Sequence, residues 1–468
     1  MQADLKMAVK KPYSKDSADE LPAKNTGSLN YLLHGPLLPT IIKLALPTVA
    51  VLFMTTILSV AETYFVSTLG IHAIAAASMV VPVMMLMTMI SNGGIGGGVS
   101  SAIARARGGN RHEDAQSLMW HALIIAICAG ALFSVVAWIA GPLIYRLLGG
   151  SGESLKLALV YSNVLFSGAI AFWVVVLMQS SLRGAGNIKV PALIMLLGVV
   201  AGLILSPIMI TGWLGFPAFG IAGAGYAQVI CNIGSMVVIL LYVTSKKSNL
   251  RLKPYPLKYA HFKEILGVGL LSTLNALMTT LGMAALTAAA GTYGVAALAG
   301  YGIASRLELL MIPIMFGFGT AVITVVGTNL GAGDVVRAKK AALINALFVG
   351  ALVGLVGLIA AVIPEAWLGI FTPDKDVIAV GSLYLLFVGP MYAFIAVILE
   401  LYFAGQGAGK VGWPLAAGFI RFALSLIASY FVFHFHASLE TAFAIVALGI
   451  FLGAAVSFLG FRKVHWLR

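Results

Sequence analysis

The sequence has few charged residues and almost no cysteine. Charged residues make up 10% of its 468 residues, against roughly a quarter in soluble domains, and the mean hydropathy is +1.00. This composition excludes a soluble enzyme and a nucleic-acid-binding domain. The two cysteines, Cys128 and Cys231, lie in apolar segments, which indicates neither a disulfide framework nor a metal cluster. We expect no metal, no cofactor and no nucleic-acid partner.

Long apolar runs dominate the chain. Hydrophobic residues make up 60% of it, enough for about a dozen spans of ~20 residues. The runs are continuous rather than alternating, which disfavours a barrel. We predict an all-α polytopic membrane protein with twelve transmembrane helices, near residues 37–68, 72–104, 117–148, 155–182, 190–213, 220–245, 262–290, 295–329, 337–364, 376–404, 411–434 and 440–461.

Lysine and arginine are distributed unevenly around these spans. With the N-terminus inside, the inner loops and the C-terminal tail hold eighteen of them, Arg105, Arg107 and Arg183 included, and the outer loops hold three. Since basic residues remain on the cytoplasmic side, we predict a multi-pass protein of the inner (plasma) membrane with both termini in the cytoplasm. The polar residues 1–35 are predicted to form a disordered cytoplasmic tail.

The chain also contains an internal repeat. Residues 183–191 align with residues 406–414 at an offset of 223, each segment containing a Gly-Ala-Gly loop, and Tyr161 meets Tyr384 at the same offset. Six helices in each unit give both halves the same orientation, with a cavity between them. We predict two pseudo-symmetric six-helix lobes, which is typical of alternating-access transporters. The segments are a first lobe at 36–245, a linker at 246–261, a second lobe at 262–461 and a tail at 462–468.

Several segments resemble one known family. Pro47 is followed fifteen residues later by Glu62 and then by a Val-x-x-Leu-Gly ending, and residues 301–308 and 331–333 also fit. In order and on a duplicated half, these segments resemble the multidrug and toxic compound extrusion (MATE) family. The resemblance implies an exporter of bulky, often cationic organic compounds, driven by protons or sodium. We expect it to act as a monomer.

Glu62 is the main candidate for proton coupling. It is the only acidic residue well inside one of the first six spans, and a carboxylate at that depth is costly unless it faces a wet or protein-lined interior. Burial favours the neutral carboxyl and a nearby cation the charged one, so the group could load and release a proton. The alternative is a protonated glutamate that only holds helices together.

The family comparison predicts an unusual neighbourhood for Glu62. In proton-coupled members an asparagine and an aspartate on the fifth helix assist the first-helix acid, and their places here are Gly202 and Ser206. We therefore expect Glu62 to work without a carboxylate partner, beside polar side chains that could equally make ordinary interhelical hydrogen bonds. These candidates for a substrate cavity or network are Tyr161, Asn163, Gln179 and Asn232.

The second lobe has its own charged residues. Sodium-coupled members have acids at places that match Thr279 and Ile395 here, and an isoleucine cannot bind a cation. The candidates present are instead Arg306, Glu308, Glu400 and Arg421. Arg306 and Glu308 could pair with each other or across helices, and Glu400 and Arg421 could form an inner gate or a structural pair.

The function predicted from these features is secondary antiport. An organic, cationic compound would be exported in exchange for protons by alternating access, with the first helix repacking at Pro47 or Pro39. A sodium-coupled exporter and a flippase for a lipid-linked saccharide are the alternatives. A membrane-embedded enzyme would need clustered acid, His or Ser groups at one depth, and the sequence has none.

Overall fold

The computed structural model describes residues 23–466, and within them every regular element is a helix. Eleven helices or continuous helix runs are long and apolar enough to cross a membrane. The bent pair α6 (Gly152–Ser167) and α7 (Ala169–Gly184) makes a twelfth span. The prediction of a twelve-helix, all-α polytopic protein is therefore confirmed.

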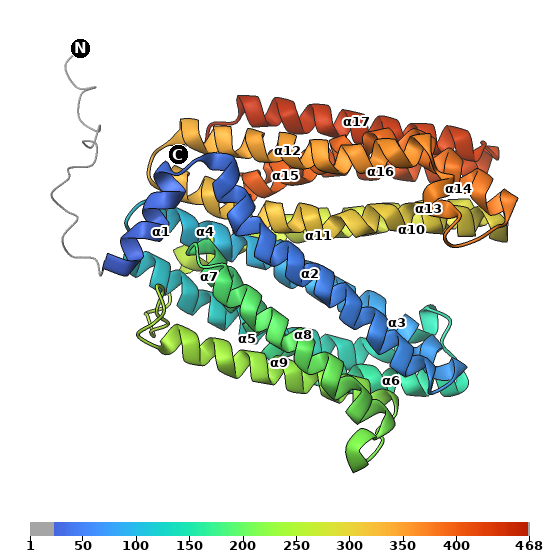
Figure 1. The fold of residues 1–468 in the computed structure, drawn as a ribbon, viewed down its shortest axis with the longest axis horizontal. Helices are drawn as coiled ribbons and strands as arrows, with labels where there is room; N and C mark the ends of the chain where they lie inside the picture. Colours follow the sequence, from blue (N-terminus) through green and yellow to red (C-terminus); the bar gives the residue numbers. More distant parts are fainter. Residues whose placement is uncertain (1–22, 467–468) are drawn as a thin grey trace.

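The two halves of the chain form two groups of helices (Figure 1). The remaining elements of the first lobe are α2 (Leu37–Ser67), α3 (Ile71–Thr88), η2 (Met89–Ile95), α4 (Gly96–Gly108), α5 (His112–Leu147), α8 (Lys189–Thr211), η3 (Trp213–Gly215) and α9 (Ile221–Thr244). The second lobe contains α10 (Tyr259–Gly291), α11 (Val295–Gly331), α12 (Val335–Val362), α13 (Glu365–Leu368), α14 (Lys375–Val388), η4 (Gly389–Met391), α15 (Tyr392–Ala408), α16 (Gly412–Phe435) and α17 (Leu439–Lys463).

Three spans are interrupted at segments that contain glycine or proline. The second span passes through a π-helical turn, η2, that includes Gly93 and Gly94. The fourth bends by 47° between α6 and α7, at Gly168. The tenth passes through the 3-10 turn η4, where Pro390 cannot donate a backbone hydrogen bond. These breaks bring backbone polar groups to the interior of the bundle, where other side chains can bind them.

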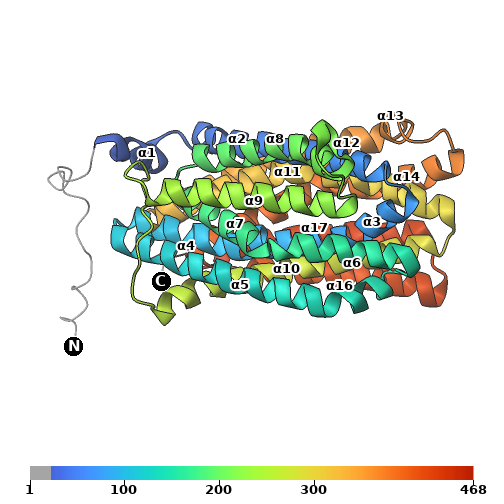
Figure 2. The same cartoon turned by 90° about the horizontal axis from the view of Figure 1, so that it is seen from below.

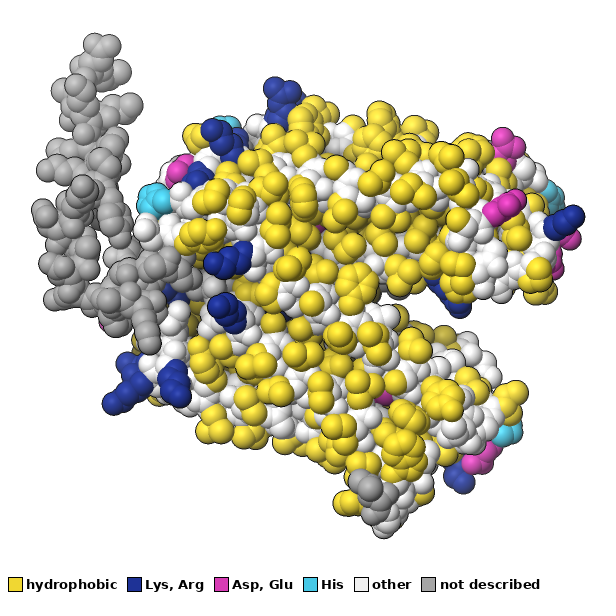
Figure 3. All heavy atoms as spheres, viewed as in Figure 1, with side chains coloured by type: hydrophobic (Ala, Val, Ile, Leu, Met, Phe, Trp, Pro, Cys, Tyr) yellow, Lys and Arg dark blue, Asp and Glu magenta, His cyan; other side chains and the backbone are white. Residues whose placement is uncertain are grey.

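The lobes meet at one end and diverge at the other. The loops at residues 109–111, 185–188 and 245–258 lie at the end where the lobes meet, which we call the basic end because Lys and Arg gather there (Figure 3). At the opposite end, the open end, the surface is hollowed between the lobes (Figure 3). Turned by 90°, the spans run side by side along the length of the molecule (Figure 2).

Helix α2 passes from one lobe to the other. Near its start, Ile41 and Ala45 belong to the hydrophobic core of the second lobe, and near its end Val66 belongs to the core of the first. Figure 1 shows this helix crossing the face of the molecule. The crossing delivers Glu62, one turn before Val66, to the first lobe at the open-end half of the span.

The N-terminal tail departs from the prediction of disorder over residues 1–35. Residues 1–22 lie outside the described residues, but α1 (Ala23–His34) is helical. Leu32 is 4% exposed in the core of the second lobe, and Asn329 Nδ2 donates a hydrogen bond to its carbonyl at 3.3 Å. The last turn of α1 thus packs against the second lobe through the apolar side chain of Leu32.

Candidate functional site

Glu62 makes one side-chain hydrogen bond among the described residues. Ser206 Oγ on α8 donates to Glu62 Oε1 at 3.2 Å, and no Lys, Arg or His of residues 23–466 comes within ion-pair distance of the carboxylate. Ser206 is fully buried, whereas Glu62 is half-buried. Position 206, where the family pattern predicts an aspartate, thus carries a hydroxyl that contacts Glu62 directly. The glutamate side chain is one methylene longer than an aspartate and reaches this hydroxyl.

This contact adjoins a cavity inside the first lobe. The cavity has a volume of about 170 Å³ and is bounded by Leu58 and Gly202, which lie one helical turn before Glu62 and Ser206 on the same helix faces. A side chain at Gly202 would touch Leu58, so the glycine allows the two helices to approach. Its polar lining residues are Thr55, Gln179, Gln228, Cys231, Asn232 and Ser235.

The four predicted neighbours of Glu62 divide into two groups. Gln179 and Asn232 line the cavity, whereas Tyr161 is not among the residues that line it. Asn163 is exposed on the surface, and its backbone carbonyl accepts a hydrogen bond from Trp138 Nε1 at 3.3 Å. Asn163 is therefore not brought to the site, because it lies on a different face of α6 from Tyr161.

The second lobe contains a cavity at the equivalent place of the repeat. Five of its lining residues follow five lining residues of the first cavity by 223 positions each. The pairs are Thr55 and Met278, Met195 and Gly418, Gly198 and Arg421, Val199 and Phe422, and Gly202 and Ser425. The duplication therefore extends from the sequence to the interior of both lobes.

The chemistry of the two cavities differs. The second, of about 50 Å³, is lined by Glu308, Arg421 and Thr279. Tyr384 Oη donates to Glu308 Oε2 at 3.4 Å, so the repeat partner of Tyr161 contacts a carboxylate. Arg421 faces the same cavity, but makes no ion pair within 4.0 Å among the described residues. The first-lobe cavity, which is lined by neutral amides, thus has a charged counterpart in the second lobe.

The predicted pairings in the second lobe do not form. Arg306 is exposed and has no ion-pair partner among residues 23–466, whereas Glu308 faces the cavity with Arg421. Glu400 is fully buried and accepts a hydrogen bond from Asn345 Nδ2 of α12 at 2.5 Å. Sequence spacing could not show these contacts, because the hydrogen-bond partners of Glu308 and Glu400, which are Tyr384 and Asn345, lie on other helices.

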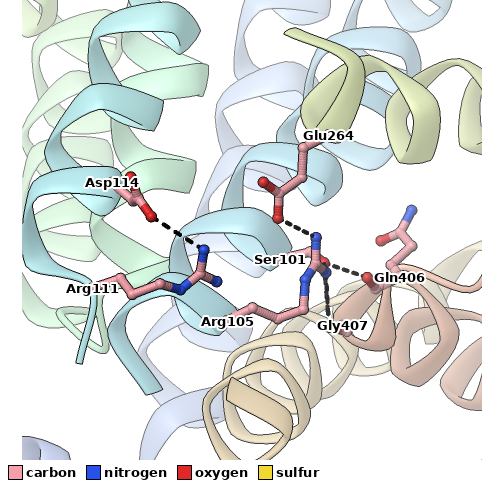
Figure 4. Close-up of polar contacts among 7 residues, drawn as sticks. All are labelled: Ser101, Arg105, Arg111, Asp114, Glu264, Gln406 and Gly407. Atoms are coloured by element: carbon pink, nitrogen blue, oxygen red, sulfur yellow. Dashed lines mark hydrogen bonds and ion pairs between the residues drawn. The ribbon is translucent and has the colours of Figure 1, made fainter. Parts of the chain in front are cut away.

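The lobes are joined at the basic end by an arginine that the sequence assigned to a loop. Arg105 lies inside α4, where its Nη2 forms an ion pair with Glu264 Oε1 of α10 at 3.0 Å and its Nη1 donates to the Gly407 carbonyl at 3.1 Å (Figure 4). Ser101 donates to the neighbouring Gln406 carbonyl. The last carbonyls of a helix lack intrahelical donors, and the first lobe supplies donors to α15 here.

Two residues at equivalent positions of the repeat also contribute to this junction. Arg183 and Gln406 stand 223 positions apart and both reach η2: Arg183 Nη2 donates to Asn92 Oδ1 at 2.9 Å, and Gln406 Nε2 donates to the Gly93 carbonyl at 2.9 Å. The Arg183 carbonyl also accepts from Thr324 of α11 at 3.0 Å. Counting Arg105, Arg107 and Arg183 as loop cations was wrong, because α4 and α7 continue through them and bury most of each side chain.

Only one signal in the sequence could have indicated this junction. Arg183 and Gln406 begin the aligned segments of the repeat, which marks the ends of the fourth and tenth spans as equivalent. Nothing local distinguishes Ser101, Arg105 or Glu264 from ordinary residues at a membrane boundary. Their role follows from the contact between lobes, which a single sequence does not contain.

The MatE family model matches residues 47–208 and 272–431, more than half of the chain. The chain belongs to the MatE family. The two matches begin 225 residues apart and end 223 apart, so one match falls in each lobe of this MatE protein. The family consists of membrane transporters, and the prediction that the chain is not an enzyme is confirmed.

Relatives and solved structures agree with that membership. The chain is 27% identical over 394 residues to a probable multidrug resistance protein NorM of Thermotoga maritima, covering 81% of this chain and 82% of that protein. It is 26% identical over 376 residues to the FAD transporter of Shewanella oneidensis, covering 79% and 82%. An outward-facing multidrug resistance MATE transporter structure matches with a TM-score of 0.83 at 26% identity, covering 92% of this chain and 96% of that one. The twelve-helix, two-lobe architecture is confirmed.

Proposed function

We propose that this MatE protein exports organic compounds, cationic ones above all, in exchange for protons, with Glu62 as the group that carries the proton. Both termini then lie in the cytoplasm, and the basic end is the cytoplasmic end. The observation that carries the proposal is the contact between Glu62 and Ser206, made at lipid depth without a cationic partner among the described residues.

Ser206 is suited to either protonation state of Glu62. A hydroxyl can donate a hydrogen bond to a carboxylate and can accept one from a protonated carboxyl. An aspartate at position 206 would instead add a second negative charge beside the first. The contact therefore supports a carboxyl group that gains and loses one proton while its position stays fixed.

The second lobe supports protons over sodium. A hard cation requires several oxygen ligands, and Ile395, at one of the family's acidic positions, is buried and apolar. Glu308 and Arg421 line the same cavity, and a guanidinium in that cavity would repel a metal cation.

The arrangement of the lobes supports export by alternating access. The basic end is closed by the junction around Arg105, while the hollow lies at the opposite end (Figure 3). A proton that neutralises Glu62 from the outside would remove the charge that holds a cationic compound, and release would follow. Each elementary charge moved through 100 mV is worth about 2.3 kcal/mol, enough to drive accumulation against a gradient.

Two arginines favour a second candidate substrate class. Arg306 is exposed, Arg421 faces the second-lobe cavity, and neither has an ion-pair partner among residues 23–466. An anionic organic compound would provide a counter-charge for Arg306 and would compete with Glu308 for Arg421, and one relative is an FAD transporter. A flavin nucleotide tested beside a cationic dye would separate the two classes.

The test uses the full chain in liposomes with an imposed pH gradient and a fluorescent organic cation. We expect Glu62→Gln to reduce gradient-driven transport to the level of protein-free liposomes. Glu153→Gln makes the same chemical change at an exposed site in the same lobe and should transport normally. Undiminished transport by Glu62→Gln, or transport driven by a sodium gradient alone, would refute proton coupling at Glu62. Ion-independent lipid scrambling would favour a flippase.

A further inference from the structure

We propose that a groove at the basic end, between α1–α2 and α8–α9, binds the headgroup of an anionic phospholipid. The groove has a volume of about 580 Å³ and is lined by Tyr31, Lys43, Pro47, Asn187 and Lys189, among others. Its lining residues include two lysines and no aspartate or glutamate. It is separate from both lobe cavities and shares no lining residue with them.

Both lysines are available to a ligand. Lys43 and Lys189 are exposed, and neither forms an ion pair among residues 23–466. Lys43 Nζ lies 5.2 Å from the centroid of the Tyr31 ring, a contact that holds the ammonium over the groove while leaving donors free. Lys189 is the first residue of α8, where the positive end of the helix dipole adds to its charge.

Polar groups on the α8–α9 side are also held in place. Asn187 Nδ2 donates to Tyr242 Oη at 2.9 Å, and the Val190 N–H donates to Asn187 Oδ1 at 3.3 Å. These bonds fix the loop that precedes α8, so the backbone beside Lys189 is held in place. The groove therefore presents two ammonium groups on two different helices, Lys43 on α2 and Lys189 on α8, to one ligand.

The surface next to the groove suits acyl chains. Leu46 on α2 is 60% exposed, and Leu193 and Leu197 on α8 are 56% and 55% exposed. Leu46 lies one turn from Lys43, and Leu193 and Leu197 follow Lys189 at intervals of four residues, so each set shares a helix face with its lysine. The lysines thus lie at the level of the headgroups and the leucines in the hydrocarbon. Basic pockets between spans on the cytoplasmic side are suited to anionic headgroups.

A lipid in this groove would connect the two lobes. The start of α2 packs in the core of the second lobe through Ile41 and Ala45, whereas α8 belongs to the first. Pro47, one of the two prolines at which we predict the first helix to repack, lines the groove. An anionic lipid that holds Lys43 and Lys189 together should therefore favour the state in which the basic end is closed.

The test measures lipid binding to the full chain by native mass spectrometry, with phosphatidylglycerol and phosphatidylcholine of the same acyl chains. We expect one tightly bound phosphatidylglycerol and no comparable phosphatidylcholine. In the double variant Lys43→Gln/Lys189→Gln the affinity should fall by about 30-fold, which corresponds to about 1 kcal/mol per lysine. The variant Lys43→Arg/Lys189→Arg should bind as the unchanged protein does.

The matched control is Lys246→Gln/Lys247→Gln, which removes the same charge from exposed linker residues at the same end but outside the groove. It should bind phosphatidylglycerol normally. An equal loss in this control, or equal binding of both lipids, would overturn the proposal. Displacement of the lipid by inorganic phosphate, independent of acyl chains, would show a free-phosphate site instead. Thermal unfolding of each variant separates loss of binding from loss of fold.

Discussion

Arg105 of α4 and Glu264 of α10 form a 3.0 Å ion pair that connects the two lobes at the basic end (Figure 4). The same guanidinium donates to the Gly407 carbonyl at the end of α15, so one side chain binds two helices of the second lobe. In a protein that works by alternating access these bonds must break whenever the basic end opens. We therefore expect the pair to stabilise the state in which the basic end is closed.

We expect Glu264→Gln to increase the population that is open at the basic end. A partly exposed ion pair is worth about 1 kcal/mol, so the ratio of states should change about fivefold. Distances between spin labels on the two lobes at the basic end, in a background lacking both native cysteines, measure that ratio. Arg111→Gln is the control, since its 3.2 Å pair with Asp114 lies within the first lobe. An equal shift in both variants would refute the assigned role.

Close backbone contact between the lobes gives a second prediction. A side chain at Gly98 of α4 would meet the Ile265 carbonyl and the Gly269 nitrogen of α10. Gly98→Ala should therefore push the lobes apart at this point, by the same spin-label measurement, since overpacking costs roughly 1–3 kcal/mol. Gly267→Ala, which faces open space on α10, is the control. If both variants give the same distances, the contact does not limit closure.

Ser206 should tune transport without being essential to it. Removing the hydrogen bond to Glu62 with Ser206→Ala costs about 1.5 kcal/mol for a bond to a charged group, which predicts transport about tenfold slower in liposomes. Ser206→Thr keeps the hydroxyl and should retain most of the rate. Full activity in Ser206→Ala, with Glu62→Gln inactive, would mean that Glu62 carries the proton without help from α8.

Glu400 should have a structural role rather than a coupling role. It is fully buried and its one hydrogen-bond partner among the described residues is Asn345, at 2.5 Å. We expect Glu400→Gln to transport normally, because a glutamine carbonyl accepts the same bond. Asn345→Ala leaves the carboxyl without a donor and should lower the unfolding free energy by about 1–3 kcal/mol, measured by thermal unfolding in detergent. Loss of proton-driven transport in a stably folded Glu400→Gln variant would contradict this.

The sequence predicted the elements of the fold well and their interruptions poorly. Each span exceeds the length that a bilayer requires, so hydropathy located all twelve. It could not locate the π-helical turn at η2 or the 47° bend at Gly168, because these depend on which helix packs against the segment. The end of α4 was missed for a related reason. The helix continues through Arg105, whose guanidinium forms an ion pair with Glu264 and donates a hydrogen bond to the Gly407 carbonyl.

The candidate site was predicted in part. Glu62 stands out in a single sequence because an acid inside an apolar run is rare, and Ser206 stands out because it departs from the family pattern. Asn163 carried a similar signal but lies on the surface. Which face of α6 is turned to the surface depends on how α3, α5 and α9 pack against it.

The sequence by itself determined the number of spans, the duplication and the one acid well inside a span of the first lobe. These features are written in local composition and in the repeated order of residues, since transfer into a bilayer depends on each segment separately. The tertiary structure alone decided that Ser206 meets Glu62, that the two lobes carry equivalent cavities of unlike charge, and that Arg105 joins the lobes. Those contacts depend on the distance between helices, which is set by packing of the whole bundle.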